Sequence, residues 1–290
     1  CELALQPINA FKLDAAILFS DILTIPDSFG LGVEFIEKEG PVFNNPINSS
    51  TDISNLDHFD PESLDYVYKA VKNIKNSLSE EIPLIGFCGS PWTLAAYSIE
   101  GRSSKDFEKT LNFLVSNQKD VHNLLTKYTD ACFLYLRRQV QSGADVIQIF
   151  DSWANLLTKE GLIEYSFNYI NALISALKLD PVTKNIPVIV FARNPKCNIE
   201  GLINTSADCI SLFWSMNDLN FELAKNKVAI QGNLDPKILL ESDEIIKRET
   251  YKILEKFEKY PGYIFNLGHG ITPDINPDKI KYLTNIVREY

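Results

Sequence analysis

The stretch IPVIVFAR, residues 186–193, is an almost unbroken apolar run rich in β-branched side chains that ends in a basic residue. A continuous run of this kind, in place of alternation between apolar and polar residues, is typical of a strand buried on both faces, as in a parallel sheet. The same pattern recurs along the chain in AAILFSD (15–21), IPLIGFCGS (82–90), DVIQIFDS (145–152), DCISLFW (208–214), KVAIQGN (227–233) and GYIFNLGHG (262–270). The sequence therefore predicts seven buried, parallel strands.

Helical patterns separate these strands. Residues 63–78 carry their apolar side chains on one stripe, and residues 104–142 keep a helical period up to Gly143, a good residue just beyond a helix end. Two further helices are predicted over residues 241–257 and 276–290. Strands that alternate with helices form either a doubly wound open sheet or a (β/α)8 barrel.

The residues that follow the predicted strands favour the barrel. Neither a GxGxxG phosphate fingerprint nor a GxxxxGK motif occurs. In a barrel, all carboxyl-terminal strand ends meet on the face where active sites are built. Polar residues or glycines occupy nearly every such end, namely Asp21, Gly89, Ser152, Arg193, Asn233 and His269. We therefore predict an α/β fold with a single (β/α)8 TIM-type barrel domain over residues 1–290. Since closure needs eight strands, we expect the first N-terminal element to precede Cys1.

Charge and cysteine content narrow the classes of partner and compartment. With 28 Lys and Arg against 38 Asp and Glu, the net charge of −10 argues against broad binding to nucleic acid or an anionic membrane surface. A few local arginines could still select an anionic small molecule. Five scattered cysteines without a CxxC pair indicate reduced thiols in a cytoplasmic protein. No stretch of eighteen apolar residues occurs.

Four side chains are candidates for chemistry, and each also has a structural explanation. Asp21 lies in an apolar segment, where a carboxylate is costly to bury without partners, so it either accepts backbone N–H bonds or serves a function. His269 could be a core histidine, Tyr97 a core side chain of a helix, and Ser152 a helix cap. Metal-ligand spacings and the GxSxG elbow are absent, so an enzyme of this sequence is expected to work without a metal or bound organic cofactor.

Read together, several segments resemble the uroporphyrinogen decarboxylase family, in the same order and over essentially the whole chain. They are LQPINAFKLDAAILFSDILTIPDSFGLG, PLIGFCGSPWTLAAYSIEG, GADVIQIFDSWAN, VAIQGNLDP and FNLGHGITPDINPDKI. The resemblance implies a cofactor-free decarboxylation of the four acetate side chains of uroporphyrinogen III to give coproporphyrinogen III in haem biosynthesis. It also implies a homodimer.

The resemblance assigns roles to individual residues. Asp21 is expected to be the catalytic group and to accept hydrogen bonds from the pyrrole N–H groups of the substrate. A fixed carboxylate there would stabilise positive charge on a protonated pyrrole, so that the substrate is its own electron sink. Tyr97, Ser152 and His269 match positions that contact the substrate. Phe19 and Phe150 are expected to form apolar cleft wall, with core packing as the alternative.

One part of the family pattern does not appear in the sequence. The family carries an arginine-rich RQAGR segment that binds substrate carboxylates, and we expect it to precede Cys1. Arg193 stands where many relatives carry lysine. Two other functions stay open from the sequence. A corrinoid-linked zinc methyltransferase shares the fold superfamily, although its HxC zinc pattern is missing. The other is a non-catalytic tetrapyrrole-binding protein.

Overall fold

Seven parallel strands form one sheet in a computed structural model, which describes residues 2–37, 40–56, 58–195, 198–216 and 221–290. Their order across the sheet follows the chain without reversal: β1 (Ala16–Ile17), β4 (Leu84–Gly89), β5 (Val146–Asp151), β6 (Val188–Ala192), β7 (Cys209–Ser211), β8 (Ala229–Gln231) and β9 (Tyr263–Ile264). A doubly wound sheet would reverse its order at a switch point. All seven predicted strands are therefore confirmed, together with the α/β class.

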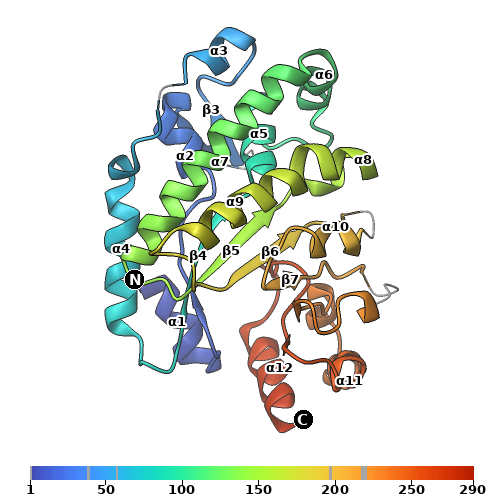
Figure 1. Cartoon of the computed structure of the whole chain (residues 1–290). Helices are drawn as coiled ribbons and strands as arrows, with labels where there is room; N and C mark the ends of the chain where they lie inside the picture. Colours follow the sequence, from blue (N-terminus) through green and yellow to red (C-terminus); the bar gives the residue numbers. More distant parts are fainter. Residues whose placement is uncertain (1, 38–39, 57, 196–197, 217–220) are drawn as a thin grey trace.

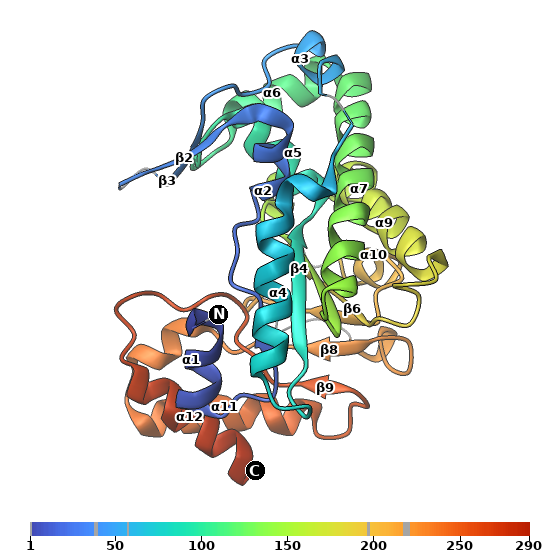
Figure 2. The ribbon, with the colours of Figure 1, turned by 90° about the vertical axis from the view of Figure 1, so that its left-hand side faces the viewer.

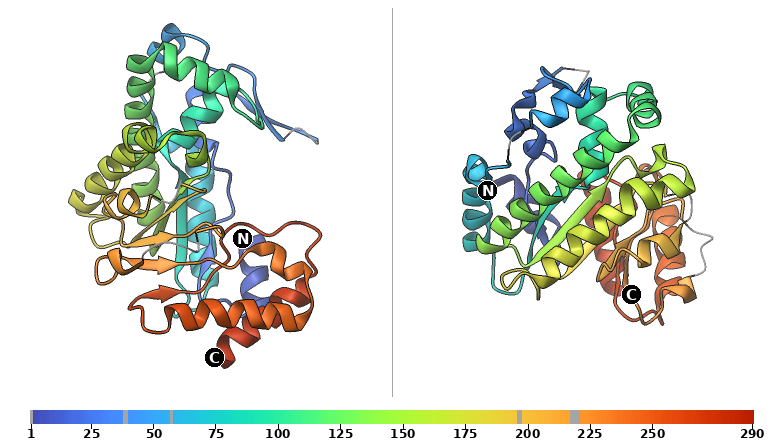
Figure 3. Two further views of the ribbon diagram at one scale, coloured as in Figure 1. Left: turned by 90° about the vertical axis from the view of Figure 1, so that its right-hand side faces the viewer. Right: turned by 45° about the horizontal axis from the view of Figure 1, so that its top comes forward.

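The sheet curls into an open half-barrel (Figures 1 and 3). Its edges are β1 and β9, each two residues long, and within the described residues they do not pair with each other. The strands are shorter than the apolar runs that predict them. An eighth strand that would close the barrel is not found within the described residues.

Helices cover the convex face of the sheet, with α4, α7 and α9 along its outside (Figure 1). The longer helices are α1 (Glu2–Phe11), α4 (Asp65–Ser77), α5 (Pro91–Glu100), α6 (Glu108–Ser116), α7 (Gln118–Gln141), α9 (Asn168–Leu179), α11 (Asp243–Phe257) and α12 (Pro277–Glu289). Shorter helical turns are α2 (Thr24–Pro26), η1 (Asp27–Leu31), α3 (Ser50–Ser54), η2 (Pro61–Leu64), η3 (Ala154–Leu156), α8 (Lys159–Gly161), η4 (Leu162–Phe167), α10 (Ile199–Ile203), η5 (Phe221–Leu223) and η6 (Pro236–Leu240).

Two helix predictions need correction, one in the middle of the helix and one at its start. The helix predicted over 104–142 is two helices, α6 and α7, because the backbone of Asn117 leaves the helical region at φ −135°. The helix predicted from residue 63 is preceded by the 3₁₀ turn η2, in which the Asp60 carboxylate caps the Glu62 N–H. At the C-terminus, α12 has the predicted form, with Asn276 as the cap.

A two-stranded antiparallel hairpin, β2 (Val33–Ile36) and β3 (Gly40–Phe43), was not predicted. It projects from the body of the molecule as an arm (Figure 2). A backbone hydrogen bond from Phe43 N to Gly101 O, 2.8 Å long, ties its base to the end of α5.

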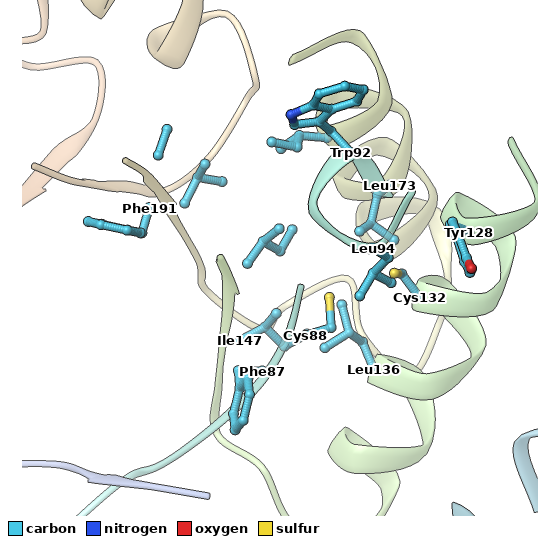
Figure 4. Close-up of a cluster of buried hydrophobic side chains, with 14 of the residues drawn as sticks. Phe87, Cys88, Trp92, Leu94, Tyr128, Cys132, Leu136, Ile147, Leu173 and Phe191 are labelled. Atoms are coloured by element: carbon cyan, nitrogen blue, oxygen red, sulfur yellow. The ribbon is translucent and has the colours of Figure 1, made fainter. Parts of the chain in front are cut away.

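The core lies on both faces of the sheet, as unbroken apolar runs require. Between the sheet and its helices, Cys88 and Leu94 pack with Cys132 of α7 (Figure 4). On the concave face, the Phe150 ring lies 5.7 Å from that of Phe87 and 6.0 Å from that of Phe191. These aromatic rings form the floor of the curl.

A second apolar cluster joins α11, α12 and η6 and consists of Leu234, Leu239, Ile246, Ile275, Leu283 and Ile286. Ile253 packs against both this cluster and the main core. Helix α1 packs against α12 (Figure 3), where Arg288 forms a 3.0 Å ion pair with Asp14.

Candidate active site

A pocket of about 630 Å³ lies inside the curl of the sheet. Because side chains alternate along a strand, every second residue of the central strands faces this space. The inward-facing residues include Ile85, Gln148, Phe150, Phe191, Ser211 and Gln231. Residues that follow strands, such as Ser152 and His269, complete one part of the lining, and Leu13 to Ala15, which precede β1, complete another. The pocket therefore fills the interior of the curl, and its carboxyl-terminal side is where parallel α/β folds bind their ligands.

Three of the predicted site residues line this pocket: Phe150, Ser152 and His269. Ser152 follows β5, and its hydroxyl has no hydrogen-bond partner within the described residues, so it does not cap the following turn η3. His269 is exposed, with its ring 5.9 Å from that of Phe213 in an edge-to-face contact. It is therefore not a buried core histidine.

Asp21 lies beyond the end of β1, just before the turn that leads into α2, and is half-buried. Its Oδ1 accepts a hydrogen bond from the Leu23 backbone N–H at 2.7 Å, whereas Oδ2 has no partner within the described residues. Burial raises the pKa of the Asp21 carboxyl, the Leu23 N–H opposes this, and the nearby Asp27 charge raises the pKa further. One oxygen thus fixes the side chain and the other is free to accept a hydrogen bond from a ligand.

Tyr97 lies on α5, a helix whose N-terminus is capped by the Ser90 hydroxyl. The Tyr97 ring packs edge-on against Trp153, with ring centres 5.6 Å apart. Burial raises the pKa of the phenol, and the Trp153 indole N–H lowers it. The Asp21 charge raises this pKa, whereas the Arg193 charge lowers it. The phenol therefore lies within electrostatic reach of both an anion and a cation at the strand ends.

The predicted residues thus fall into two groups and one outlier. Phe150, Ser152 and His269 share the pocket, whereas Asp21 and Tyr97 lie outside its lining, and the Asp21 charge raises the pKa of the Tyr97 phenol. The outlier is Phe19, which is 72% exposed and therefore not packed in the core, and which is not among the residues that line this pocket.

The sequence reasoning missed the polar residues inside the pocket. Gln148, Ser211 and Gln231 lie on inward-facing strand positions, and the Gln231 amide donates to the Ser211 hydroxyl at 3.1 Å. The available signal was a single polar residue within an apolar run, as in VIQIF. Within the described residues, the lining holds no Lys or Arg, and its one carboxylate is the ion-paired Asp14.

A second carboxylate, Asp151, lies beneath the site and was also missed. It is fully buried at the end of β5 and accepts hydrogen bonds from the hydroxyls of Ser90 at 2.9 Å, Thr93 at 3.0 Å and Ser166 at 2.5 Å. Burial raises its pKa, and the three hydroxyls oppose that shift. These bonds tie β5 to α5 and η4, and thereby hold the backbone that carries Ser152.

Within the described part of the chain, no cluster of three or more His, Cys, Asp or Glu side chains is arranged to hold a metal ion. None of the described helices is long and apolar enough to cross a membrane.

Sequentially ordered parallel strands that curl around a pocket define an α/β protein of the TIM-barrel type. A methyltransferase from Methanosarcina mazei has a similar fold, with a TM-score of 0.82 and 18% identity over 99% of this chain and 84% of its own. A B12-independent methionine synthase from a Shewanella species gives a TM-score of 0.62 at 13% identity, covering 99% of this chain and 86% of that one. At these identities the likeness is one of fold alone.

Sequence similarity identifies the family within this class. Residues 1–290 match the family described as "Uroporphyrinogen decarboxylase (URO-D)". The uroporphyrinogen decarboxylase of Ruthia magnifica is 44% identical over all of this chain and 84% of its own length, and that of Pseudoalteromonas atlantica is 44% identical over all of this chain and 82% of its own. The chain belongs to the uroporphyrinogen decarboxylase family and is a carboxy-lyase, which confirms the prediction from the sequence.

Proposed function

We propose that this enzyme removes the carboxyl groups of the four acetate side chains of uroporphyrinogen III and releases coproporphyrinogen III. Its family membership makes it a decarboxylase of porphyrin biosynthesis. The observation that carries the finer proposal is the Asp21 carboxylate, which is half-buried at a strand end and keeps one oxygen without a partner in the described structure.

The chemistry explains why a carboxylate is useful in this position. Cleavage of the bond to CO2 leaves an electron pair on the side-chain carbon, which needs an electron sink. A proton that adds to a pyrrole ring carbon makes the ring cationic, and the ring then accepts that pair as CO2 departs. A second proton adds to the exocyclic carbon to form the methyl group, and the ring loses the first. The net change consumes one proton for each CO2.

Asp21 stabilises the cationic ring by accepting hydrogen bonds from the pyrrole N–H groups. The attraction between opposite charges is much stronger in a shielded site than in water. Tyr97 and Ser152 each offer a hydroxyl to a substrate carboxylate, and His269 offers an imidazole at the far side of the pocket. Phe150 supplies apolar surface for the macrocycle.

The test is turnover by the intact gene product. Anaerobic incubation with uroporphyrinogen III, followed by oxidation and chromatography of the porphyrins, should show four successive losses of CO2. Oxidised uroporphyrin is the matched control, because it lacks four converging N–H donors and should not react. Methyl transfer would indicate the methyltransferase function instead, and binding without product would indicate a tetrapyrrole-binding protein.

We also propose that the protein is a cytoplasmic homodimer and that residues 1–290 behave as one domain. The family resemblance supports the dimer, and the scattered cysteines support the compartment. The contact of Ile253 with both apolar clusters supports a single domain. Analytical ultracentrifugation should give twice the protomer mass, fractionation should recover the protein with cytoplasmic markers, and unfolding in urea should show one transition at every probe.

A further inference from the structure

Arg193 extends the ladder between β5 and β6 by one step. The register pairs Phe150 with Phe191 and Asp151 with Ala192, and the Arg193 N–H then donates to Asp151 O at 2.9 Å. The next positions in this register are Ser152 and Arg193, which therefore lie side by side. Because side chains alternate along a strand, Arg193 shares the inward face of the sheet with Phe191, which lines the pocket.

The Arg193 guanidinium is held in place by an aromatic side chain. Its central carbon lies 5.5 Å from the centre of the Trp153 ring, and the residue is half-buried. Such stacking orients a guanidinium while leaving its N–H donors free at the edge. The same guanidinium lowers the pKa of Tyr97, so it also lies near that hydroxyl.

Arg193 also stands out because it lacks an anionic partner. Within the described residues no carboxylate lies within ion-pair distance of it. Four of the six arginines in the chain do have such a partner: Arg137, Arg138, Arg248 and Arg288. In a chain of net charge −10, a half-buried guanidinium that has no carboxylate partner and lies beside the pocket-lining Ser152 is suited to an anionic ligand.

We propose that Arg193, together with the adjacent Ser152 hydroxyl, binds a propionate carboxylate that the tetrapyrrole keeps throughout the reaction. This inference rests on the proposed function. Pairing with the reacting acetate would stabilise the carboxylate before CO2 leaves more than the transition state, and would therefore slow the step. A cation that holds a retained carboxylate instead adds binding energy equally to substrate and product. Arg193 is thus a specificity-determining residue for the periphery of the macrocycle, whereas Asp21 acts at its centre.

The experiment compares R193Q with the charge-retaining R193K in the intact protein. R248Q, which removes an exposed arginine on α11, is the control for loss of a positive charge. Binding of coproporphyrinogen III, which carries four propionates and no acetates, is measured at equilibrium, and turnover of uroporphyrinogen III is measured separately. Circular dichroism and thermal unfolding check that each variant folds.

R193Q is expected to weaken coproporphyrinogen binding about tenfold or more, as for loss of a charged hydrogen bond. The KM for uroporphyrinogen should rise by a similar factor, with kcat within about threefold of wild type because the lost binding is uniform. R193K should recover most of the affinity, and R248Q should match wild type.

Three outcomes would overturn the inference. The first is an R193Q variant that binds coproporphyrinogen as tightly as wild type does. The second is a loss of affinity in R193Q for uroporphyrinogen alone, which would assign Arg193 to an acetate. The third is an R193Q variant with a lower kcat and an unchanged KM. If wild type binds coproporphyrinogen without decarboxylating uroporphyrinogen, the proposed function fails, and the binding comparison still decides the role of Arg193. A wild-type protein that binds no coproporphyrinogen refutes both.

Discussion

Replacement of Asp21 by asparagine removes the negative charge that faces the site and keeps the hydrogen bond that fixes the side chain to the backbone. The asparagine carbonyl can still accept the 2.7 Å bond from the Leu23 N–H, so the local turn is kept. The variant loses the negative charge, and the second oxygen, which is free to accept a hydrogen bond from a ligand, becomes an amide NH2 group that can only donate. A unit charge about 4 Å from a cationic ring is worth about 4 kcal/mol at an effective dielectric constant near 20. Since 1.36 kcal/mol is tenfold in rate, D21N should lower kcat about 10²- to 10³-fold.

The stability of the same variant should move in the opposite direction. Burial raises the pKa of Asp21, so the folded state binds a proton more tightly than the unfolded chain does. A group of this kind contributes stability below its unfolded pKa, and the contribution is lost as pH rises through the folded pKa. At pH 7 the wild type therefore carries the penalty of an ionised, half-buried carboxylate. D21N should unfold at the same temperature as wild type or slightly above it.

Asp27 offers a matched control on the same segment. Its Oδ1 accepts the Val33 N–H at 2.9 Å, which asparagine can also do, and its charge raises the pKa of Asp21. D27N should keep nearly full activity at pH 7 and shift the acid limb of kcat/KM to lower pH. Initial rates of coproporphyrinogen formation over a pH series measure both effects. A D21N enzyme within fivefold of wild type, or a D27N enzyme equally impaired, would refute the role given to Asp21.

Three further substitutions test the surroundings of the site. G268A should lower the free energy of unfolding, measured in urea, by roughly 2 kcal/mol, because the new Cβ would lie 2.3 Å from the Trp214 backbone nitrogen. The control G270A should leave the stability unchanged, because its Cβ meets no atom within 4 Å. D151A should cost roughly 2–4 kcal/mol in the same assay, since three hydroxyls lose their shared acceptor; an unchanged urea midpoint would contradict that. S152A should raise KM a few-fold and leave the melting temperature unchanged, because its hydroxyl has no partner within the described structure; a markedly lower melting temperature would assign Ser152 a structural role.

The arrangement of the strands was readable from the sequence because burial on both faces leaves a direct trace in runs such as IPVIVFAR. The hairpin β2–β3 leaves no such trace, because Val33 is half-buried and the other three residues of β2 are exposed. The position of the hairpin also depends on a contact with the end of α5, which is distant in the sequence. The break at Asn117 could not be predicted, because the apolar periodicity of a helix continues on both sides of it. A polar residue at a kink has the same sequence pattern as a polar residue on the solvated face of a continuous helix.

Within the pocket, the sequence pointed to residues that follow a strand, and it gave no sign of residues whose position depends on neighbours from other elements. Ser152 and His269 were identified because strand ends converge in this class of fold. In the sequence, Asp151 is one of several polar residues at strand ends. Its burial could not be predicted, because the three hydroxyls that bind it come from α5, its capping residue and η4. Phe19 follows the same strand as Asp21, yet its ring is exposed, because a strand of two residues does not fix the direction of side chains beyond it.

The bond between Asp21 and Leu23 has a consequence for repeated turnover. A carboxylate whose rotamer is already fixed needs little reorganisation when positive charge develops in front of it. Four acetate groups on four pyrroles must each reach the reactive position, and the anchored anion does not follow them. With Asp21 acting as proposed, the macrocycle must therefore turn or leave and rebind between steps, while this carboxylate stays in place.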